Sequence, residues 1–237
     1  MVKAPVVMKR ELNALFLSPT AYVVLTAFAF GQGLFVLGLR APVEPVWTVQ
    51  SLFGWSQYLL MVAAPVLTMR LLSAEVRSGT IEALMTTPVT EMEVVLGKFS
   101  AVLVFGVVLL LPVVGQTLCL SLLGNVDAGA ALAGFMGLFL LTAQFLAVGL
   151  LCSALTRTQT ASAIVAFVVL IALYFLWTVS WAEPGVAAAL ARYVSPPGHF
   201  KNFTRGLVDT RDLTYFVVTT ALLVSLAVKS LQLRKWR

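Results

Sequence analysis

The stretch Val104-Phe-Gly-Val-Val-Leu-Leu-Leu-Pro112 lies near the middle of the chain and is apolar at odd and even positions alike. A strand of a membrane barrel would alternate polar with apolar residues, whereas a helix surrounded by lipid is apolar on every side. The stretch belongs to the longer apolar run Phe99–Leu123. Because about 20 residues let a helix cross about 30 Å of hydrocarbon, this run predicts a transmembrane helix.

Six apolar runs of this kind divide the 237 residues, of which 60% are hydrophobic and 11% charged, with a mean hydropathy of +0.97. Soluble globular domains do not reach this balance, so a water-soluble enzyme, a disordered chain and a disulfide-stapled module are excluded. We expect an all-α polytopic membrane protein, built as a single transmembrane domain over residues 1–237. The six predicted spans are about Thr20–Leu39, Phe53–Leu72, Phe99–Leu123, Gly129–Leu155, Ala161–Trp181 and Leu213–Leu231. We expect kinks at Pro65 and Pro112, which remove a backbone donor inside their spans.

The sixteen Lys and Arg residues divide eleven to five between the two sides of such a bundle, with the larger group on the side of both termini. Cytoplasmic loops carry an excess of basic residues, so both termini should face the cytoplasm. The net charge of +6 is then expected to meet anionic lipid headgroups. No soluble basic domain is present that would bind nucleic acid.

Residues 3–17 place Val7, Leu12, Leu15 and Phe16 near one helical face, and Lys9, Arg10 and Asn13 toward another. This pattern predicts a short amphipathic helix at the cytoplasmic interface, which Ser18-Pro19 would end. The alternative is a charged flank that only sets the topology.

The segment from Arg70 to Lys98, between spans two and three, carries four glutamates and three basic residues. Thr80 could cap a short helix that Pro88 would stop, and Thr90 with Glu93 has the spacing of a capping box. The first helix would expose Ile81, Leu84 and Met85 on one face. It could plug a groove on another protein or only cover the bundle, and the spacing leaves both readings open.

The longest external segment is predicted at residues 182–212. Gly185 to Tyr193 is compatible with a helix, Ser195-Pro-Pro-Gly198 predicts a rigid break, and the following residues suit an interfacial or re-entrant helix. We expect Phe200 and Phe203 to seat this segment at the headgroups. His199, the single histidine, is expected to be a polar loop residue, since no metal-ligand spacing surrounds it.

The sequence predicts that the chain is not an enzyme and binds no cofactor. Gly97-Lys98 is followed by Phe99 and lacks the glycine-rich approach of a phosphate-binding loop, and no nucleophile elbow occurs. The polar residues within the spans are mainly amides and hydroxyls. Four of the amides could line a translocation path, although hydrogen bonding between helices is the commoner use; they are Gln32, Gln57, Gln116 and Gln144.

Three parts of the sequence together resemble the permeases of ABC-2 type transporters. The central part is Glu75-Val-Arg-Ser-Gly79-Thr80-Ile-Glu82-Ala-Leu-Met-Thr-Thr-Pro88, followed by Val95-Leu-Gly-Lys98. Lys9-Arg-Glu-Leu12 with Ser18-Pro19 fits the same family, as does the block from Ser195 to Asp212. This last block is most similar to the permeases associated with bacterial gliding motility, which are relatives of the nitrous oxide reductase maturation permeases.

The resemblance implies a six-helix permease that exports a substrate and pairs with a second permease copy or a homologous permease. Two cytoplasmic ATPase subunits would bind ATP and Mg²⁺ and dock on a coupling helix between spans two and three. An extracytoplasmic or auxiliary membrane subunit is a further possible partner. An alternative function is that of a mechanical transducer, which relays ATPase motion to such a partner without bulk transport. The residues implied at the ATPase interface are Glu75, Arg77, Gly79, Thr80, Ile81, Glu82, Leu84 and Met85.

The uneven distribution of basic residues predicts which cysteines are accessible from outside an intact cell. Cysteines introduced at Val126 and Ala188 should react with an impermeant thiol reagent, whereas a cysteine at Ser78 should not. Labelling at Ser78 would overturn both the orientation and the coupling assignment.

Overall fold

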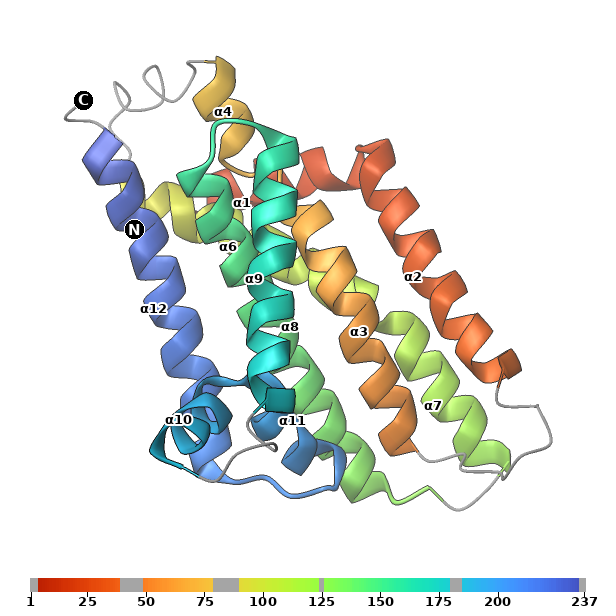
Figure 1. The fold of residues 1–237 in the computed structure, drawn as a ribbon. Helices are drawn as coiled ribbons and strands as arrows, with labels where there is room; N and C mark the ends of the chain where they lie inside the picture. The colour runs from red at the N-terminus through yellow and green to blue at the C-terminus, as the bar shows by residue number, and fades with distance from the viewer. Residues whose placement is uncertain (1–3, 39–48, 79–89, 124–125, 180–184, 235–237) are drawn as a thin grey trace.

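The computed structural model describes residues 4–38, 49–78, 90–123, 126–179 and 185–234, and every regular element in these ranges is a helix (Figure 1). The all-helical prediction is therefore confirmed. The helices are α1 Ala4–Phe16, α2 Pro19–Gly38, α3 Val49–Thr68, α4 Ser73–Ser78, α6 Glu91–Leu109, α7 Leu111–Leu123, α8 Ala128–Leu155, α9 Gln159–Val179, α10 Val186–Val194, α11 Pro196–Thr204 and α12 Thr210–Arg234.

The described part of the chain has five helices long and apolar enough to cross a membrane, or six if a bent pair is counted as one span. The bent pair consists of α1 and α2, whose axes meet at 68° across Ser18. The five spans other than the bent pair coincide with predicted spans two to six. The second and third begin earlier than predicted, at Val49 and Glu91, because polar residues there continue the helices beyond the apolar runs.

Helix α8 is the centre of the bundle and the most buried of these spans. It contacts α3, α6, α9, α11 and α12, while the outer faces of α9 and α12 stay largely uncovered. Hydropathy alone does not distinguish these positions, since α8, α9 and α12 all pass as membrane spans. Helix α8 is the most buried because other helices pack around it, whereas α9 and α12 each leave one side uncovered by the described helices.

Glycines on α8 allow its neighbours to approach closely. A methyl group added at Gly149 would lie 2.0 Å from the Thr68 hydroxyl of α3, and one at Gly137 would lie 2.4 Å from Cβ of Phe203 in α11. Small residues at helix crossings are the usual means of close packing in membranes, where lipid removes the hydrophobic driving force between helices.

The expected kink at Pro112 corresponds to an interruption of the third span. Helix α6 ends at Leu109 and α7 begins at Leu111, so the two helices form one long span that is interrupted at Leu110. Pro112 lies in the first turn of α7, where a missing backbone donor costs little. Helix α3, by contrast, continues through Pro65 to Thr68.

Two short helices, α10 and α11, close one end of the bundle, and α1, α4 and the last turns of α12 lie at the other (Figure 1). The break predicted at Ser195-Pro-Pro-Gly198 is confirmed at Ser195, which separates α10 from α11, but its extent to Gly198 is wrong, because the two prolines occupy the first turn of α11. Prolines fit a first turn because their missing N–H groups have no partner there in any helix.

The prediction that Phe200 and Phe203 lie at the lipid headgroups is also wrong. Both rings are buried inside the bundle, with Phe203 against Gly137 of α8. The aromatic residues anchor α11 in the core, so the segment is part of the fold and not a surface strap. Ala188 is buried as well, so a cysteine at this position would be hard to label. The exposed Val186 is the better position for external labelling.

We predict that Gly149→Ala lowers the thermal unfolding temperature of the purified protein, because the new methyl group collides with Thr68 and overpacking costs about 1–3 kcal/mol. Gly54→Ala is the matched control, since open space surrounds Gly54 in α3. It should leave the unfolding temperature unchanged or slightly raised. Equal destabilisation by both substitutions would contradict the close approach of α3 and α8.

Candidate functional site

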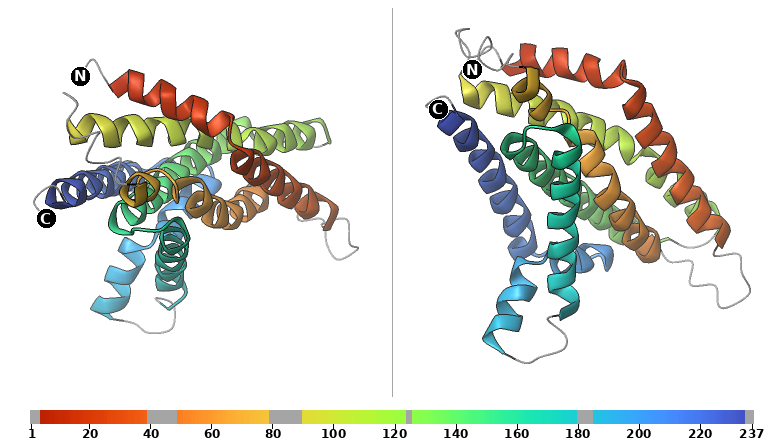
Figure 2. Two further views of the ribbon diagram at one scale, coloured as in Figure 1. Left: turned by 90° about the horizontal axis from the view of Figure 1, so that it is seen from above. Right: turned by 45° about the horizontal axis from the view of Figure 1, so that its top comes forward.

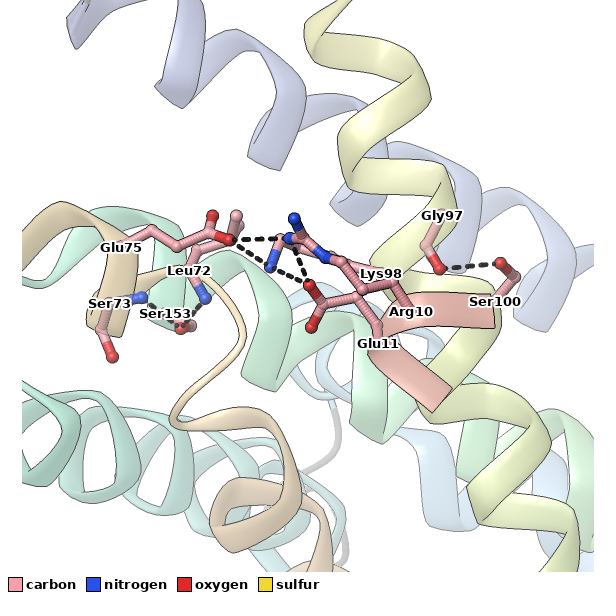
Figure 3. Close-up of polar contacts among 9 residues, drawn as sticks. All are labelled: Arg10, Glu11, Leu72, Ser73, Glu75, Gly97, Lys98, Ser100 and Ser153. Carbon is pink, nitrogen blue, oxygen red and sulfur yellow. Dashed lines mark hydrogen bonds and ion pairs between the residues drawn. The ribbon is translucent and has the colours of Figure 1, made fainter. Parts of the chain in front are cut away.

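A buried lysine at the start of the third span joins three helices. The side chain of Lys98, in α6, is 2% exposed, and its Nζ lies 2.8 Å from Oε1 of Glu75 in α4 and 3.1 Å from Oε1 of Glu11 in α1 (Figure 3). Arg10 completes the cluster from the solvent side, with Nη2 at 3.0 Å from the Glu11 carboxylate and 3.7 Å from that of Glu75. We call Arg10, Glu11, Glu75 and Lys98 the ion cluster.

The charges of the ion cluster balance, with two cations and two carboxylates. Its burial is graded: Lys98 is enclosed, the two carboxylates are about one-sixth exposed, and Arg10 is 61% exposed. An ammonium group removed from water is stable only when it is paired and hydrogen-bonded, and here two carboxylates meet this need.

The electrostatics at Glu11 follow from this arrangement. Burial by itself raises the pKa of the Glu11 carboxyl, but attraction to Lys98 and hydrogen bonds from Arg10 and Lys98 outweigh it. The pKa therefore lies below its ordinary value, and Glu11 stays ionised at neutral pH. The carboxylate remains a permanent acceptor for Lys98.

Close backbone packing holds α1 in place for this contact. Helices α1 and α6 lie side by side (Figure 2), and a methyl group added at Gly97 would lie 2.9 Å from Cβ of Val7 and 3.0 Å from the carbonyl oxygen of Ala4. Gly97 thus lets the backbones approach, and the neighbouring Lys98 reaches Glu11. The local motif Gly97-Lys98 serves helix packing and ion pairing together.

The carboxylate of Glu75 is positioned by the turn between α3 and α4. The backbone N–H groups of Leu72 and Ser73 donate to the hydroxyl of Ser153 in α8, at 3.1 and 3.0 Å (Figure 3). The Ser153 hydroxyl in turn donates to the carbonyl oxygen of Met69 at 3.3 Å. Helix α4 therefore leaves the bundle from a fixed point on its central helix.

A cavity of about 230 Å³ opens beside the ion cluster, between α1, α2, α3 and α4. Its lining includes Glu11, Glu75 and Lys98, together with Arg70, which donates to the hydroxyls of Ser18 and Thr20 at 3.3 Å. The cavity is polar enough for water to reach both carboxylates. The bend between α1 and α2 is thus tied to the end of α3 by a second cationic side chain.

Glu75 and Arg77, two of the residues implied at an ATPase interface, both lie in α4 but on different sides of the helix. Glu75 takes part in the ion cluster, whereas Arg77 is exposed and makes no ion pair with any residue in the described ranges. Residues two apart on a helix lie on opposite sides. The remaining six residues of the predicted interface lie outside the described residues; they are Gly79, Thr80, Ile81, Glu82, Leu84 and Met85.

The segment after this gap begins as the spacing predicted. Thr90 caps α6 by accepting a hydrogen bond from the N–H of Glu93 at 3.3 Å, and the Glu93 carboxylate accepts from the N–H of Thr90 at 3.1 Å. The predicted capping box is therefore confirmed. Both ends of the undescribed segment 79–89 are thus attached to rigid helices.

The amides considered for a translocation path occupy different environments. Gln32 donates to Ser56 at 2.7 Å, and Gln144 donates to Thr219 at 2.9 Å, so both connect helices within the subunit. Gln57 lines a cavity of about 210 Å³ at the end near α11, and Gln116 is half-buried in α7. Gln57 and Gln116 are therefore the two whose surroundings better suit a path.

The hydrogen bonds of His199 were not predicted from the sequence. Its Nδ1 lies 2.6 Å from Oδ1 of Asp212, its Nε2 lies 2.9 Å from the carbonyl oxygen of Tyr193, and its ring stacks on Tyr215. Asn202 donates to the other oxygen of Asp212 at 2.7 Å. This network joins α10, α11 and α12, and no metal-binding group of His, Cys, Asp and Glu occurs among the described residues.

The ion cluster itself was also missed, because its partners lie far apart in sequence. The sequence places Lys98 beside Gly97 at the start of a span but gives no partner for its charge. One signal was available: Glu11 is an acid on an otherwise basic helix, and an acid on a helix that packs against the bundle needs a buried cation.

Comparison with known families gives the context for this site. The sequence model of the ABC-2 family transporter proteins matches residues 15–231, which is nearly the whole chain. The chain belongs to the ABC-2 transporter family. A search of curated proteins gave no match. Members of the ABC-2 family are multi-pass membrane permeases that partner with ABC ATPase subunits, and the permease is normally the non-enzymatic component.

In this ABC-2 permease, the ion cluster predicts an asymmetric response to charge removal. Lys98→Met should lower the unfolding free energy by about 3–5 kcal/mol, because it removes the buried cation and leaves the two largely buried carboxylates with only the exposed Arg10 beside them. The triple variant Glu11→Gln/Glu75→Gln/Lys98→Met should recover most of this loss. Thermal unfolding in detergent measures both, and a single variant as stable as the wild type would contradict a buried, paired Lys98.

Proposed function

We propose that the chain is the permease subunit of an ABC-2 type transporter in a bacterial inner membrane, with both termini in the cytoplasm. It would couple ATP hydrolysis by two separate cytoplasmic ATPase subunits, which bind ATP and Mg²⁺, to substrate export. A second permease copy or a homologous permease would complete the transmembrane assembly. Family membership and the end-to-end separation of α4 from α10 and α11 support this proposal.

The observation that carries the proposal is the 2.8 Å contact between Glu75 and Lys98. Glu75 belongs to the segment that resembles the coupling stretch of the family, and Lys98 belongs to a span. A movement imposed on this segment by an ATPase would therefore act directly on α6, and through Glu11 on α1. Ligand-driven motion requires contacts that differ between two states, and an ion cluster that shifts as a unit relative to the rest of the bundle would change the contacts around it.

A division of roles follows along α4. Glu75 faces the bundle, and Arg77, two residues later, is exposed on the other side, where it could meet an acidic residue of the ATPase. The residues from Gly79 to Met85 would form the coupling helix. We propose that Ile81, Leu84 and Met85 enter a groove on the ATPase and that Glu82 pairs with a basic residue at its edge.

A mechanical transducer is the second candidate, and the packing of α11 favours it. Phe200 and Phe203 are buried against the central helix, so a movement of the bundle would be passed to α10 and α11 at the opposite end. Gln32 and Gln144 spend their donors on bonds within the subunit. We further propose, from the resemblance of the block Ser195 to Asp212, that the chain is related to the gliding-motility permeases. A transducer of this kind would act on an extracytoplasmic or auxiliary membrane partner.

The coupling proposal predicts the outcome of a charge swap. Glu75→Lys should leave the ATPase bound to the purified complex but lower permease-dependent ATP hydrolysis about tenfold or more, since a buried attraction becomes a repulsion. The fourfold variant Arg10→Glu/Glu11→Lys/Glu75→Lys/Lys98→Glu should restore hydrolysis, because it reverses every charge of the ion cluster and so keeps each pair opposite in sign.

Loss of stability alone must be separated from loss of coupling. Gly137→Ala is a suitable control, because its new methyl group would collide with Phe203 of α11, at the opposite end of the bundle from the ion cluster, and the variant should keep hydrolysis at a matched temperature below unfolding. Hydrolysis that falls equally in Glu75→Lys and in the fourfold variant would contradict transmission through the ion cluster. Failure of the ATPase to bind any form of the chain would contradict the proposed function as a whole.

A further inference from the structure

A long apolar groove runs between α6 and α12, on the outer face of the bundle, with α8 as its floor. Its volume is about 660 Å³, which lies in the range of sites for small ligands. The lining is almost entirely apolar and includes Leu96, Phe99, Leu103, Leu140, Phe216 and Val224. Neither the ion cluster nor the end formed by α10 and α11 shares any of these residues.

One end of the groove carries a positive charge. Lys229 lines the groove near the last turns of α12, beside Gln232, and its side chain is exposed. Its ammonium group makes no ion pair with any residue in the described ranges. Glu93, near the start of α6, is held in its capping box with Thr90. The mouth of the groove thus offers a cation that nothing described within the chain neutralises.

The length of the groove suits a lipid tail. From Phe216 to Lys229 the axis of α12 rises about 20 Å, at about 1.5 Å per residue. One half of the hydrocarbon core of a bilayer is about 15 Å deep, so a tail that starts at Lys229 would end near the membrane centre. A lysine near the end of a span reaches the headgroup layer with its ammonium group while its methylenes stay in the apolar layer.

We infer that this groove binds one anionic phospholipid, with an acyl chain between α6 and α12 and the phosphate at Lys229. The lipid comes from the leaflet at the end of the bundle where α1 and α4 lie. A second copy of the chain is a poorer occupant, because a two-fold interface through this face would turn each Lys229 toward the same face of the other copy. The inference concerns α6 and α12 alone and does not depend on the proposed coupling function.

Two pairs of variants test the charge and the shape of the groove separately. Lys229→Gln removes the cation, and Arg157→Gln is its control, an exposed arginine of the short loop between α8 and α9 at the same end. Ala221→Trp fills the groove from α12, and Leu222→Trp, on the next residue and outside the lining, controls for the added ring. Each variant is first checked for monodispersity and unfolding temperature.

The measurement is native mass spectrometry of the purified chain titrated with phosphatidylglycerol or with phosphatidylcholine. Wild type and both controls should bind one phosphatidylglycerol in preference to phosphatidylcholine. Lys229→Gln should reduce this preference about fivefold, equivalent to about 1 kcal/mol for one lysine near an anionic headgroup. Ala221→Trp should lower retention of both lipids by about tenfold.

Three results would overturn the inference. One is equal binding of the two lipids by the wild type, and another is an equal loss of preference in Lys229→Gln and Arg157→Gln. The third is a shift from dimer to monomer in Ala221→Trp that Leu222→Trp does not show, which would assign the groove to a second copy of the chain.

Discussion

The burial of Lys98 is the constraint on which the end of the bundle formed by α1, α4 and the start of α6 depends. An ammonium group that is 2% exposed requires anionic partners, and the chain supplies them from two other helices, Glu11 of α1 and Glu75 of α4. No residue in α1 is fully buried, and its apolar side chains that pack against the core, Leu15 and Phe16, lie near its end. The ion cluster and the close approach at Gly97 therefore place α1, and with it the bend into α2.

Elsewhere the bundle is organised mainly by shape, with the network of His199, Asn202 and Asp212 joining α10, α11 and α12. Gly137 and Gly149 leave room on α8 for Phe203 and Thr68, so α11 and α3 sit deep against the central helix. The donors of Gln32 and Gln144 bond to neighbouring helices, which favours one arrangement of the spans in an environment without competing water. Tightly packed helices tend to move as rigid bodies, so a force applied at the ion-paired end would be transmitted through the packed middle of the bundle.

The local sequence pattern was sufficient to predict the helical class, five spans with their approximate limits, and the capping box of α6, because these features depend on residues close in sequence. It could not predict the ion cluster, since Glu11 and Lys98 meet only after the chain has folded. Phe200 and Phe203 were misplaced for a related reason: an aromatic residue beside charges suits a membrane interface as well as a core, and the glycine that receives Phe203 lies on α8, far away in sequence. The predicted break at Ser195 extended too far, to Gly198, because prolines can begin a helix as well as end one.

The central claim is that α1, α4 and the start of α6 move together because the ion cluster holds them. The most direct measurement is the distance between spin labels at the exposed positions Asn13 of α1 and Arg77 of α4, by pulsed electron spin resonance, in the complex with its ATPase, with and without nucleotide. We predict one narrow distance distribution that nucleotide does not change, and a broad distribution when Lys98→Met removes the cation. A nucleotide-dependent change in the wild-type distance, or a narrow distribution in Lys98→Met, would contradict the claim.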